Sequence, residues 1–337
     1  MPKLALKISA IATILGVALV LTGCTSDTES TDTTTNAAAN ASTEECTESG
    51  SASDSIDVTG DFGAEPVVSF ESPLTATDTE RTVTIAGTGT EEASTHRLVE
   101  VSLIGFSATT GEPIITSGWD DTATSAYINV DETQELEGLA RAVNCAVVGD
   151  RVTVVIPPAD AFGTAGQTDL GITADDSMVF VMDVKSIVPQ TATGTDEAAV
   201  DGLPTVELAE DGAPSITIPD AEAPTDLKIE TLKTGDGAVV ASGDTVALEY
   251  TGVLWKNGEE FDSSWANAGL VQFPTTGVVE GFGAAMVGQT VGSQVLAVIP
   301  PDQGYGEAGS GDLISATDTL VFVLDIVAVT YPAATTE

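Results

Sequence analysis

The feature that most restricts how this chain can fold is an internal repeat with a constant spacing of 143 residues. The segment Val148–Pro158 matches Val291–Pro301 in its apolar pattern and in its closing Pro-Pro pair. After a slip of one residue the match extends to Met178–Val184 with Leu320–Ile326, and the leading strands Pro66–Phe70 and Pro214–Ile218 correspond loosely. Because self-similarity at a fixed period marks repeated structural units, we expect two copies of one fold, each of about 130 residues.

Within each copy the pattern is mainly that of β-strands. Alternating apolar residues or β-branched runs mark three strands of the second copy: Thr245–Tyr250, Gln294–Ile299 and Thr319–Val327. Asn257-Gly258 is a strong hairpin-turn signal. Only the short segment Gly281–Gly288 has helical spacing, with Phe282, Ala285 and Met286 on one face. Strands with one short helix predict the α+β class.

The charge of the chain restricts its partners. Fifty-two acidic residues against ten basic ones give a net charge of −42. We expect no nucleic-acid partner, because affinity for phosphate backbones comes from Lys and Arg. The acidic residues are expected to form a solvated surface.

The first residues resemble an export signal. Lys3 and Lys7 precede an apolar stretch of 14 residues, Ile8–Leu21, which is shorter than the roughly 20 residues of a membrane-spanning helix. The following Leu21–Cys24 resembles a bacterial lipobox, which ends in a cysteine that receives a lipid. We therefore expect a signal peptide at residues 1–23 and lipidation of Cys24. The protein would then lie at the cell membrane, facing outside the cytoplasm, and be attached to the membrane by the lipid alone.

Composition sets the remaining boundaries. Residues 24–56 are almost free of aliphatic side chains after the cysteine, and predict a flexible tether. We expect the first copy at 57–189, a linker at 190–203, the second copy with its leading strand at 204–330, and a tail at 331–337.

Few side chains are available for metal or nucleophilic chemistry. Besides Cys24 there are only Cys46 and Cys145, which in an exported protein either form a disulfide or remain two free thiols. The single histidine, His96, lies in a polar stretch, and we expect it at the surface. A His-rich or Cys-rich metal site is excluded by inventory, and we expect no cofactor.

Four motifs of the second copy resemble the FKBP family of peptidyl-prolyl isomerases. They are Tyr250-Thr251-Gly252, Phe261-Asp262-Ser263-Ser264, Gly281-Phe282 and Ile299–Gly306, in the family's order and spacing over roughly Asp226–Val329. The resemblance implies two tandem FKBP-like domains, each a curled antiparallel sheet that wraps one short helix. It also implies cis/trans isomerisation of X-Pro bonds in exported polypeptides, and binding of macrolides of the rapamycin type.

The same resemblance assigns roles to nine residues. Tyr250, Asp262, Phe282 and Tyr305 would be catalytic, with Phe282 as the floor, Asp262 accepting from Tyr250, and Tyr305 donating to the substrate carbonyl. Substrate-binding positions would be Phe261, Val278, Val279, Ile314 and Phe322, with Ile314 on a flap over the site. Taken singly, Phe261, Phe282 and Phe322 are better explained as core residues. Tyr250 alone could be a strand aromatic, Asp262 a turn cap, and Gly304–Gly306 a turn. Their co-occurrence favours the isomerase site.

The first copy lacks these side chains. Aligning the two copies gives Gly105 for Tyr250, Ile114 and Ile115 for Phe261 and Asp262, Leu139 for Phe282, and Phe162 for Tyr305. We therefore expect a non-catalytic first copy, and an isomerase in the second that assists folding of exported proteins. Extra residues between Asp120 and Gln134, including Tyr127–Val130, suggest one additional strand there. The alternative function is a non-catalytic binding or holding-chaperone module on the same fold.

Overall fold

The computed structural model describes residues 45–119, 124–267 and 269–331. The expected signal peptide, Cys24 and most of the expected tether lie outside these residues, as do residues 332–337 of the expected tail. Within the described ranges, no helix is long and apolar enough to cross a membrane.

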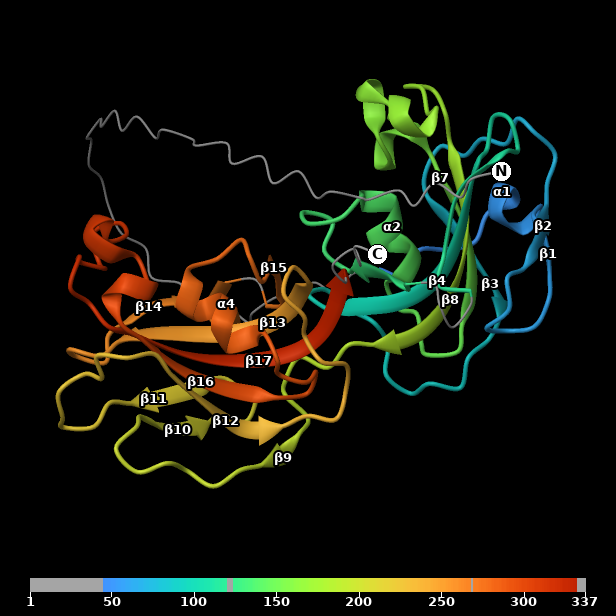
Figure 1. The fold of residues 1–337 in the computed structure, drawn as a ribbon. Helices are drawn as coiled ribbons and strands as arrows, with labels where there is room; N and C mark the ends of the chain where they lie inside the picture. Colours follow the sequence, from blue (N-terminus) through green and yellow to red (C-terminus); the bar gives the residue numbers. More distant parts are fainter. Residues whose placement is uncertain (1–44, 120–123, 268, 332–337) are drawn as a thin grey trace, which may run out of the picture. The chain divides into compact units, whose positions relative to one another are not determined.

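The first copy is built around a six-stranded antiparallel sheet in which β3-β7-β8-β4-β5 lie in that order and β6 also pairs with β4 (Figure 1). Its elements are α1 (Ser51–Asp54), β1 (Asp57–Thr59), β2 (Val67–Ser69), β3 (Glu80–Ile85), β4 (Leu98–Ser107), β5 (Pro113–Ser117), β6 (Ala126–Asn129), α2 (Glu137–Val143), β7 (Arg151–Ile156), the 3₁₀ turns η1 (Pro158–Asp160), η2 (Gly163–Ala165) and η3 (Thr168–Leu170), and β8 (Met178–Ile187).

The second copy is built around a seven-stranded sheet in the order β14-β13-β17-β16-β12-β9, with β15 paired to β13. Its elements are β9 (Thr195–Asp196), β10 (Thr205–Leu208), β11 (Pro214–Thr217), β12 (Lys228–Thr234), β13 (Thr245–Leu254), β14 (Glu260–Ser263), α3 (Ser264–Asn267), β15 (Val271–Pro274), α4 (Glu280–Met286), β16 (Gln294–Ile299), η4 (Pro301–Gln303), η5 (Gly306–Ala308) and β17 (Leu320–Tyr331).

Each sheet is covered on both faces, which the sequence analysis did not anticipate. Side chains of alternate residues point to opposite faces of a strand. In the second copy Leu248, Tyr250 and Leu254 join α4 in one core cluster. Val253 and Trp255 point the other way and pack with the hairpin β10–β11, which Figure 1 shows on the face opposite α4. The hairpin β1–β2 covers the first copy's sheet in the same manner.

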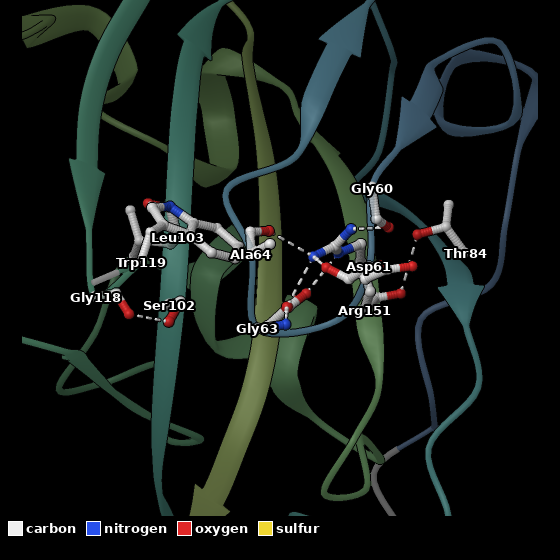
Figure 2. Close-up of polar contacts among 11 residues, drawn as sticks. Gly60, Asp61, Gly63, Ala64, Thr84, Ser102, Leu103, Gly118, Trp119 and Arg151 are labelled. Carbon is white, nitrogen blue, oxygen red and sulfur yellow. Dashed lines mark hydrogen bonds and ion pairs between the residues drawn. The ribbon is translucent and has the colours of Figure 1, made fainter. Parts of the chain in front are cut away.

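A buried ion pair fixes the β1–β2 hairpin to the first sheet (Figure 2). Arg151 is 1% exposed and donates from Nε to Oδ1 of Asp183 at 2.6 Å and from Nη2 to Oδ2 at 2.8 Å. The guanidinium also donates to the carbonyl oxygens of Gly60 and Ala64 in the loop between β1 and β2. The Gly63 N–H completes the contact by donating to Asp183. With all its partners in place, the charge of Asp183 is compensated although the side chain is fully buried.

The expected extra strand of the first copy is not additional. The segment Tyr127–Val130 coincides with β6, which pairs with β4 in the way that β15 pairs with β13. Both copies therefore contain this strand, and the expectation was wrong. The extra residues of the first copy lengthen the connections on either side of β6. As a result, the difference in residue number between corresponding positions falls from 147 at β4 and β13 to 145 at β6 and β15, and then to 143.

That drift in spacing also corrects the alignment at Tyr250. Gly105 pairs with Phe180 across the sheet, as Gly252 pairs with Phe322. The counterpart of Tyr250 is therefore Leu103, not Gly105. Strand register decides the match here, because a constant offset fails wherever a loop differs in length.

The segment 190–203 pairs with the second copy. Asp196 in β9 pairs with Lys233 in β12, and the Gly194 N–H donates to the Gly292 carbonyl oxygen. The Ala192 N–H donates to Oδ2 of Asp325 at 2.8 Å, on the face opposite α4. The segment expected to be a linker therefore extends the second sheet by one edge strand.

The two cysteines of the folded region are joined. A disulfide connects Cys46 and Cys145 with their Cα atoms 5.7 Å apart, across 99 residues of sequence. Cys145 follows the turn after α2, so the bond attaches the start of the described chain to the first copy.

Candidate active site

The candidate site is an aromatic cluster on the face of the second sheet that carries α4. Tyr250 comes from β13, Phe261 from the neighbouring edge strand β14, Phe322 from β17 and Phe282 from α4. The rings of Phe282 and Phe322 lie 5.0 Å apart and nearly perpendicular, and those of Phe261 and Phe322 are 5.3 Å apart in the same arrangement. Tyr250 meets Phe282 edge-on at 5.8 Å. Edge-to-face contacts of this kind stabilise a fixed ring arrangement, so the cluster is a preformed apolar wall.

A glycine lets two of these rings close over the sheet. A Cβ atom on Gly252 would lie 2.6 Å from the Phe261 ring and 2.7 Å from the Phe322 ring, which is closer than real contacts allow. Gly252 therefore makes room for both rings directly beside Tyr250 on β13.

The polar edge of the cluster is a hydrogen bond between Tyr250 and Asp262. The Tyr250 hydroxyl donates to Oδ2 of Asp262 at 2.5 Å. Burial of the ring, followed by this hydrogen bond and the charge of Asp262, raises the pKa of the Tyr250 phenol. The hydroxyl therefore remains a donor at neutral pH. Asp262 is exposed on β14, and its carboxylate is held beside the aromatic cluster by this hydrogen bond.

The other expected substrate contacts lie around the same cluster. Val278 and Val279 pack against it from the turn before α4, and Ile314 packs from the segment after η5 and is 7% exposed. Tyr305 lies between η4 and η5 and is 39% exposed, and its phenol contributes to the raised pKa of Tyr250. Seven of the nine residues expected at the site therefore belong to one apolar cluster or pack against it, Asp262 is hydrogen-bonded to Tyr250 at its edge, and Tyr305 is an exposed residue.

The sequence analysis missed one aromatic residue of the cluster. Phe273 on β15 lies 6.0 Å from both Tyr250 and Phe282, measured between ring centroids. The signal was present in the alternation of Val271, Gln272 and Phe273, which is the pattern of a strand with one buried face.

The corresponding region of the first copy is apolar without a polar edge. Leu103 and Phe180 belong to its core, and Ile114, Ile115 and Leu139 pack against them. Neither a phenol nor a carboxylate stands at the positions of Tyr250 and Asp262. The first copy therefore keeps the scaffold of the site without its hydrogen-bonding groups.

A protein-family model described as FKBP-type peptidyl-prolyl cis-trans isomerase matches this chain at residues 89–185 and 237–327. The first range runs from before β4 into β8, and the second from before β13 into β17, so both copies are matched.

Curated relatives agree with this match. A probable FK506-binding protein of Corynebacterium glutamicum is 40% identical over 109 residues, which are 32% of this chain and 92% of that protein. An FK506-binding protein of Streptomyces anulatus is 40% identical over 114 residues, 33% of this chain and 92% of that protein. An FKBP-type 22 kDa peptidyl-prolyl cis-trans isomerase of Escherichia coli is 38% identical over 100 residues, covering 30% and 48% of the two chains.

Proposed function

Because the chain belongs to the FKBP-type peptidyl-prolyl cis-trans isomerase family, we propose that its isomerase activity resides in the second copy, at the Tyr250–Asp262 cluster. The observation that carries this proposal is the difference between the two copies. Both match the family model, but only the second has a phenol hydrogen-bonded to a carboxylate at the edge of an aromatic cluster.

The geometry suits rotation about a peptide bond. The planar amide resists rotation by about 18–20 kcal/mol because resonance gives its C–N bond double-bond character. A pocket that binds the twisted amide more strongly than either planar form lowers that barrier. The proline ring is apolar and would lie against Phe282, between Phe261 and Phe322. The twisted carbonyl would accept a hydrogen bond from Tyr305 at the rim. The Val279 N–H provides a second donor at the entrance to α4.

Asp262 and Tyr250 would shape the wall of the pocket without exchanging a proton with the substrate. The hydrogen bond between them fixes the Tyr250 ring against Phe282. It also satisfies the phenol, which would otherwise be an unpaired polar group in a largely apolar environment. Removing either partner should therefore loosen the wall.

The proposed substrates are exported polypeptides that contain X-Pro bonds, and the proposed location is outside the cytoplasm. The Cys46–Cys145 disulfide supports an oxidising compartment. The lipobox-like Leu21–Cys24 supports attachment by a lipid on Cys24. Incorporation of a labelled fatty acid into the wild-type chain, lost in Cys24→Ser, would be the expected result. Equal labelling of both chains would contradict the anchor.

The activity is tested by following cis-to-trans conversion of short X-Pro peptides with the full-length chain, with and without rapamycin. We expect acceleration that the macrolide blocks and that Asp262→Val, Tyr305→Phe and Phe282→Ala each reduce. The first two substitutions change side chains at the exposed edge, so they report on the site even if Phe282→Ala destabilises the core. If the folded wild-type chain matches the uncatalysed rate on several peptides, the proposed isomerase activity is wrong. A binding or holding-chaperone module would then be the remaining interpretation.

A further inference from the structure

A second polar cluster lies directly behind the candidate site, on the opposite face of the sheet. Glu249 precedes Tyr250 on β13 and is 1% exposed, and Asp325 pairs with it from β17 and is 3% exposed. Two buried carboxyl groups thus lie side by side in a protein region where a charged group normally needs a partner. The mechanism described above uses neither.

Ser264 connects this cluster to Tyr250. Its hydroxyl donates to Oε2 of Glu249, and its Oγ accepts the Tyr250 backbone N–H at 2.8 Å. Ser264 is 3% exposed and follows β14 immediately, two residues after Asp262. The strand ladder between β13 and β14 covers Thr251 to Val253 and stops before Tyr250. Beyond the ladder, the Ser264 side chain therefore holds the strand of Tyr250 to the strand of Asp262.

The surroundings of Glu249 make ionisation of its carboxyl group unfavourable. Burial and, to a lesser extent, the charge of Asp325 together raise the pKa of the Glu249 carboxyl to about 7, although the hydrogen bond from Ser264 lowers it. Asp325 accepts hydrogen bonds from the Gln294 side chain at 2.7 Å and from the Ala192 N–H, and its own pKa is raised by burial. Ionisation of Glu249 would place two negative charges in the same buried cluster.

Other charged groups around the cluster do not face Glu249 as directly. Lys233 on β12 acts on Asp325, and its Nζ lies 3.7 Å from Asp196. His96 lies beyond Gly269: a Cβ on that glycine would be 3.5 Å from Oε1 of Glu249 and 3.3 Å from Cβ of His96. The His96 ring is directed to Asp131, with 3.6 Å between Nδ1 and Oδ2.

The first copy has lost this connection along with the site. Ser102 pairs with Asp183 where Glu249 pairs with Asp325, and Arg151 compensates that aspartate. The Ser102 hydroxyl donates to the Gly118 carbonyl oxygen instead (Figure 2). Ser117, at the position of Ser264, donates to the Thr124 carbonyl oxygen. The glutamate–serine connection therefore occurs in the copy that has the Tyr250–Asp262 pair and is missing from the copy that lacks it.

We propose that Glu249, acting through Ser264, is a positioning residue that holds Tyr250 and Asp262 together and makes the isomerase site responsive to pH. The proposal rests on the function proposed above. While Glu249 is protonated, it is not repelled by the charge of Asp325, and the hydrogen bonds from Glu249 through Ser264 to Tyr250 are maintained. Once Glu249 ionises, repulsion from Asp325 displaces it, Ser264 moves with it, and the Tyr250–Asp262 pair loosens.

The test compares the pH profile of peptide isomerisation for the full-length wild-type chain, Glu249→Gln and His96→Asn. Glutamine keeps the acceptor for Ser264 and cannot ionise. The wild type should lose at least about threefold in kcat/KM between about pH 6 and pH 8, since small displacements of positioning groups change rates steeply. Glu249→Gln should retain its activity across this range. His96→Asn removes the single histidine and should behave as the wild type. Ser264→Ala should lower activity at every pH, and Ser264→Thr should restore part of it.

Two results would overturn the proposal: a wild-type profile without this fall, or a fall that persists in Glu249→Gln. An independent readout separates this failure from failure of the proposed function. The backbone amide signal of Tyr250 in an NMR titration should shift with the ionisation of Glu249 in the wild type and stay constant in Glu249→Gln. If the signal titrates but no variant accelerates isomerisation, the connection stands and the assigned function falls. If catalysis is present but the signal does not titrate, the connection is wrong.

Discussion

The two copies of this protein share strand order and register, and differ in the polar residues on both faces of their sheets. On the helix side, the second copy has Tyr250 and Asp262 where the first has Leu103 and Ile115. On the hairpin side, the first copy has the compensated pair Arg151–Asp183. The second has Gln294 beside Asp325 and a second carboxyl at Glu249. The scaffold therefore keeps a buried aspartate, Asp183 or Asp325, in both copies while the polar groups around it differ.

The difference shows how each copy compensates its buried carboxyl groups. In the first copy the buried aspartate is neutralised and serves to fix the β1–β2 loop. Among the residues that the structure describes, no buried cation lies beside the two carboxyl groups of the second copy, and Ser264 beside the candidate site donates a hydrogen bond to one of them, Glu249. A buried pair that is fully compensated stabilises one conformation, whereas an uncompensated one responds to pH.

The largest effect is expected from breaking the compensation in the first copy. Arg151→Ala leaves Asp183 buried without its cation, which should lower the free energy of unfolding by about 3–5 kcal/mol. Chemical denaturation of the full-length chain measures this. The matched control is Lys185→Ala, since Lys185 forms an exposed ion pair with Glu100 at 3.4 Å and should cost only about 0–1 kcal/mol. Equal losses in the two variants would show that the buried pair does not hold the first copy together.

The next effect is expected from the disulfide, which also belongs to the first copy. Replacing Cys46 and Cys145 by serine should lower the free energy of unfolding by about 2–4 kcal/mol, because the bond closes a long loop in the unfolded chain. Isomerase activity per folded molecule should stay unchanged, since the candidate site is in the second copy. A parallel loss of activity under conditions in which the variant is folded would contradict that separation.

A matched pair of substitutions compares the two pocket floors directly. Phe282→Ala should lower kcat/KM for X-Pro peptides at least about tenfold, which is a loss of about 1.4 kcal/mol in transition-state binding. Leu139→Ala at the corresponding place in the first copy should leave kcat/KM unchanged. If Leu139→Ala is as damaging as Phe282→Ala, both copies contribute to the activity.

The smallest effect concerns the pH dependence of stability in the second copy. The pKa of Glu249 is raised from 4.5 to about 7, so the folded state binds the proton more tightly than the unfolded chain does. This contribution to stability is complete below the lower value and is lost as the pH rises through about 7. Glu249→Gln should therefore be more stable than the wild type at about pH 8 by about 1–2 kcal/mol, after allowance for solvent screening, and the difference should shrink toward pH 5.

Glu100 on β4 provides the control of opposite sign. Burial favours its neutral form, but hydrogen bonds from Ser125 and Ser186 and the charge of Lys185 lower its pKa overall. Its ionised form is the one favoured in the folded state, so Glu100→Gln should not stabilise the protein at about pH 8. Denaturation midpoints across pH measure both variants. A similar gain in both would mean that removing any acidic charge from this chain, and not the burial of Glu249, is the cause.

Much of the site could be inferred from the sequence because its residues lie in short local motifs. Tyr250 and Gly252, Phe261 and Asp262, and Gly281 and Phe282 are adjacent or nearly so, and their order along the chain could be compared with a known family. Their convergence on one cluster required only that the strands take the family's order. Phe273 was missed because its strand is four residues long and carries no motif.

The correspondence of Tyr250 with Leu103 could not be inferred, because it depends on register. Loop lengths differ between the copies around β6, and only the pairing of Gly105 with Phe180 reveals the shift. The sequence also could not show that the leading hairpin of each copy covers one face of its sheet. The alternating residues of β1–β2 and β10–β11 predict strands, but which surface they bury is set by contacts with distant segments.

The sequence by itself determined the repeat, the strands, the short helix and the identity of the pocket side chains, because periodicity and motifs are local properties. Tertiary structure decided which strands correspond, what covers each sheet, and how Cys46 meets Cys145. It also brought Glu249, Ser264 and Asp325 together behind the site, from three segments whose spacing carries no sign of their contact. Such contacts arise from sheet pairing between residues far apart in the chain, and their chemistry exists only once that pairing has formed.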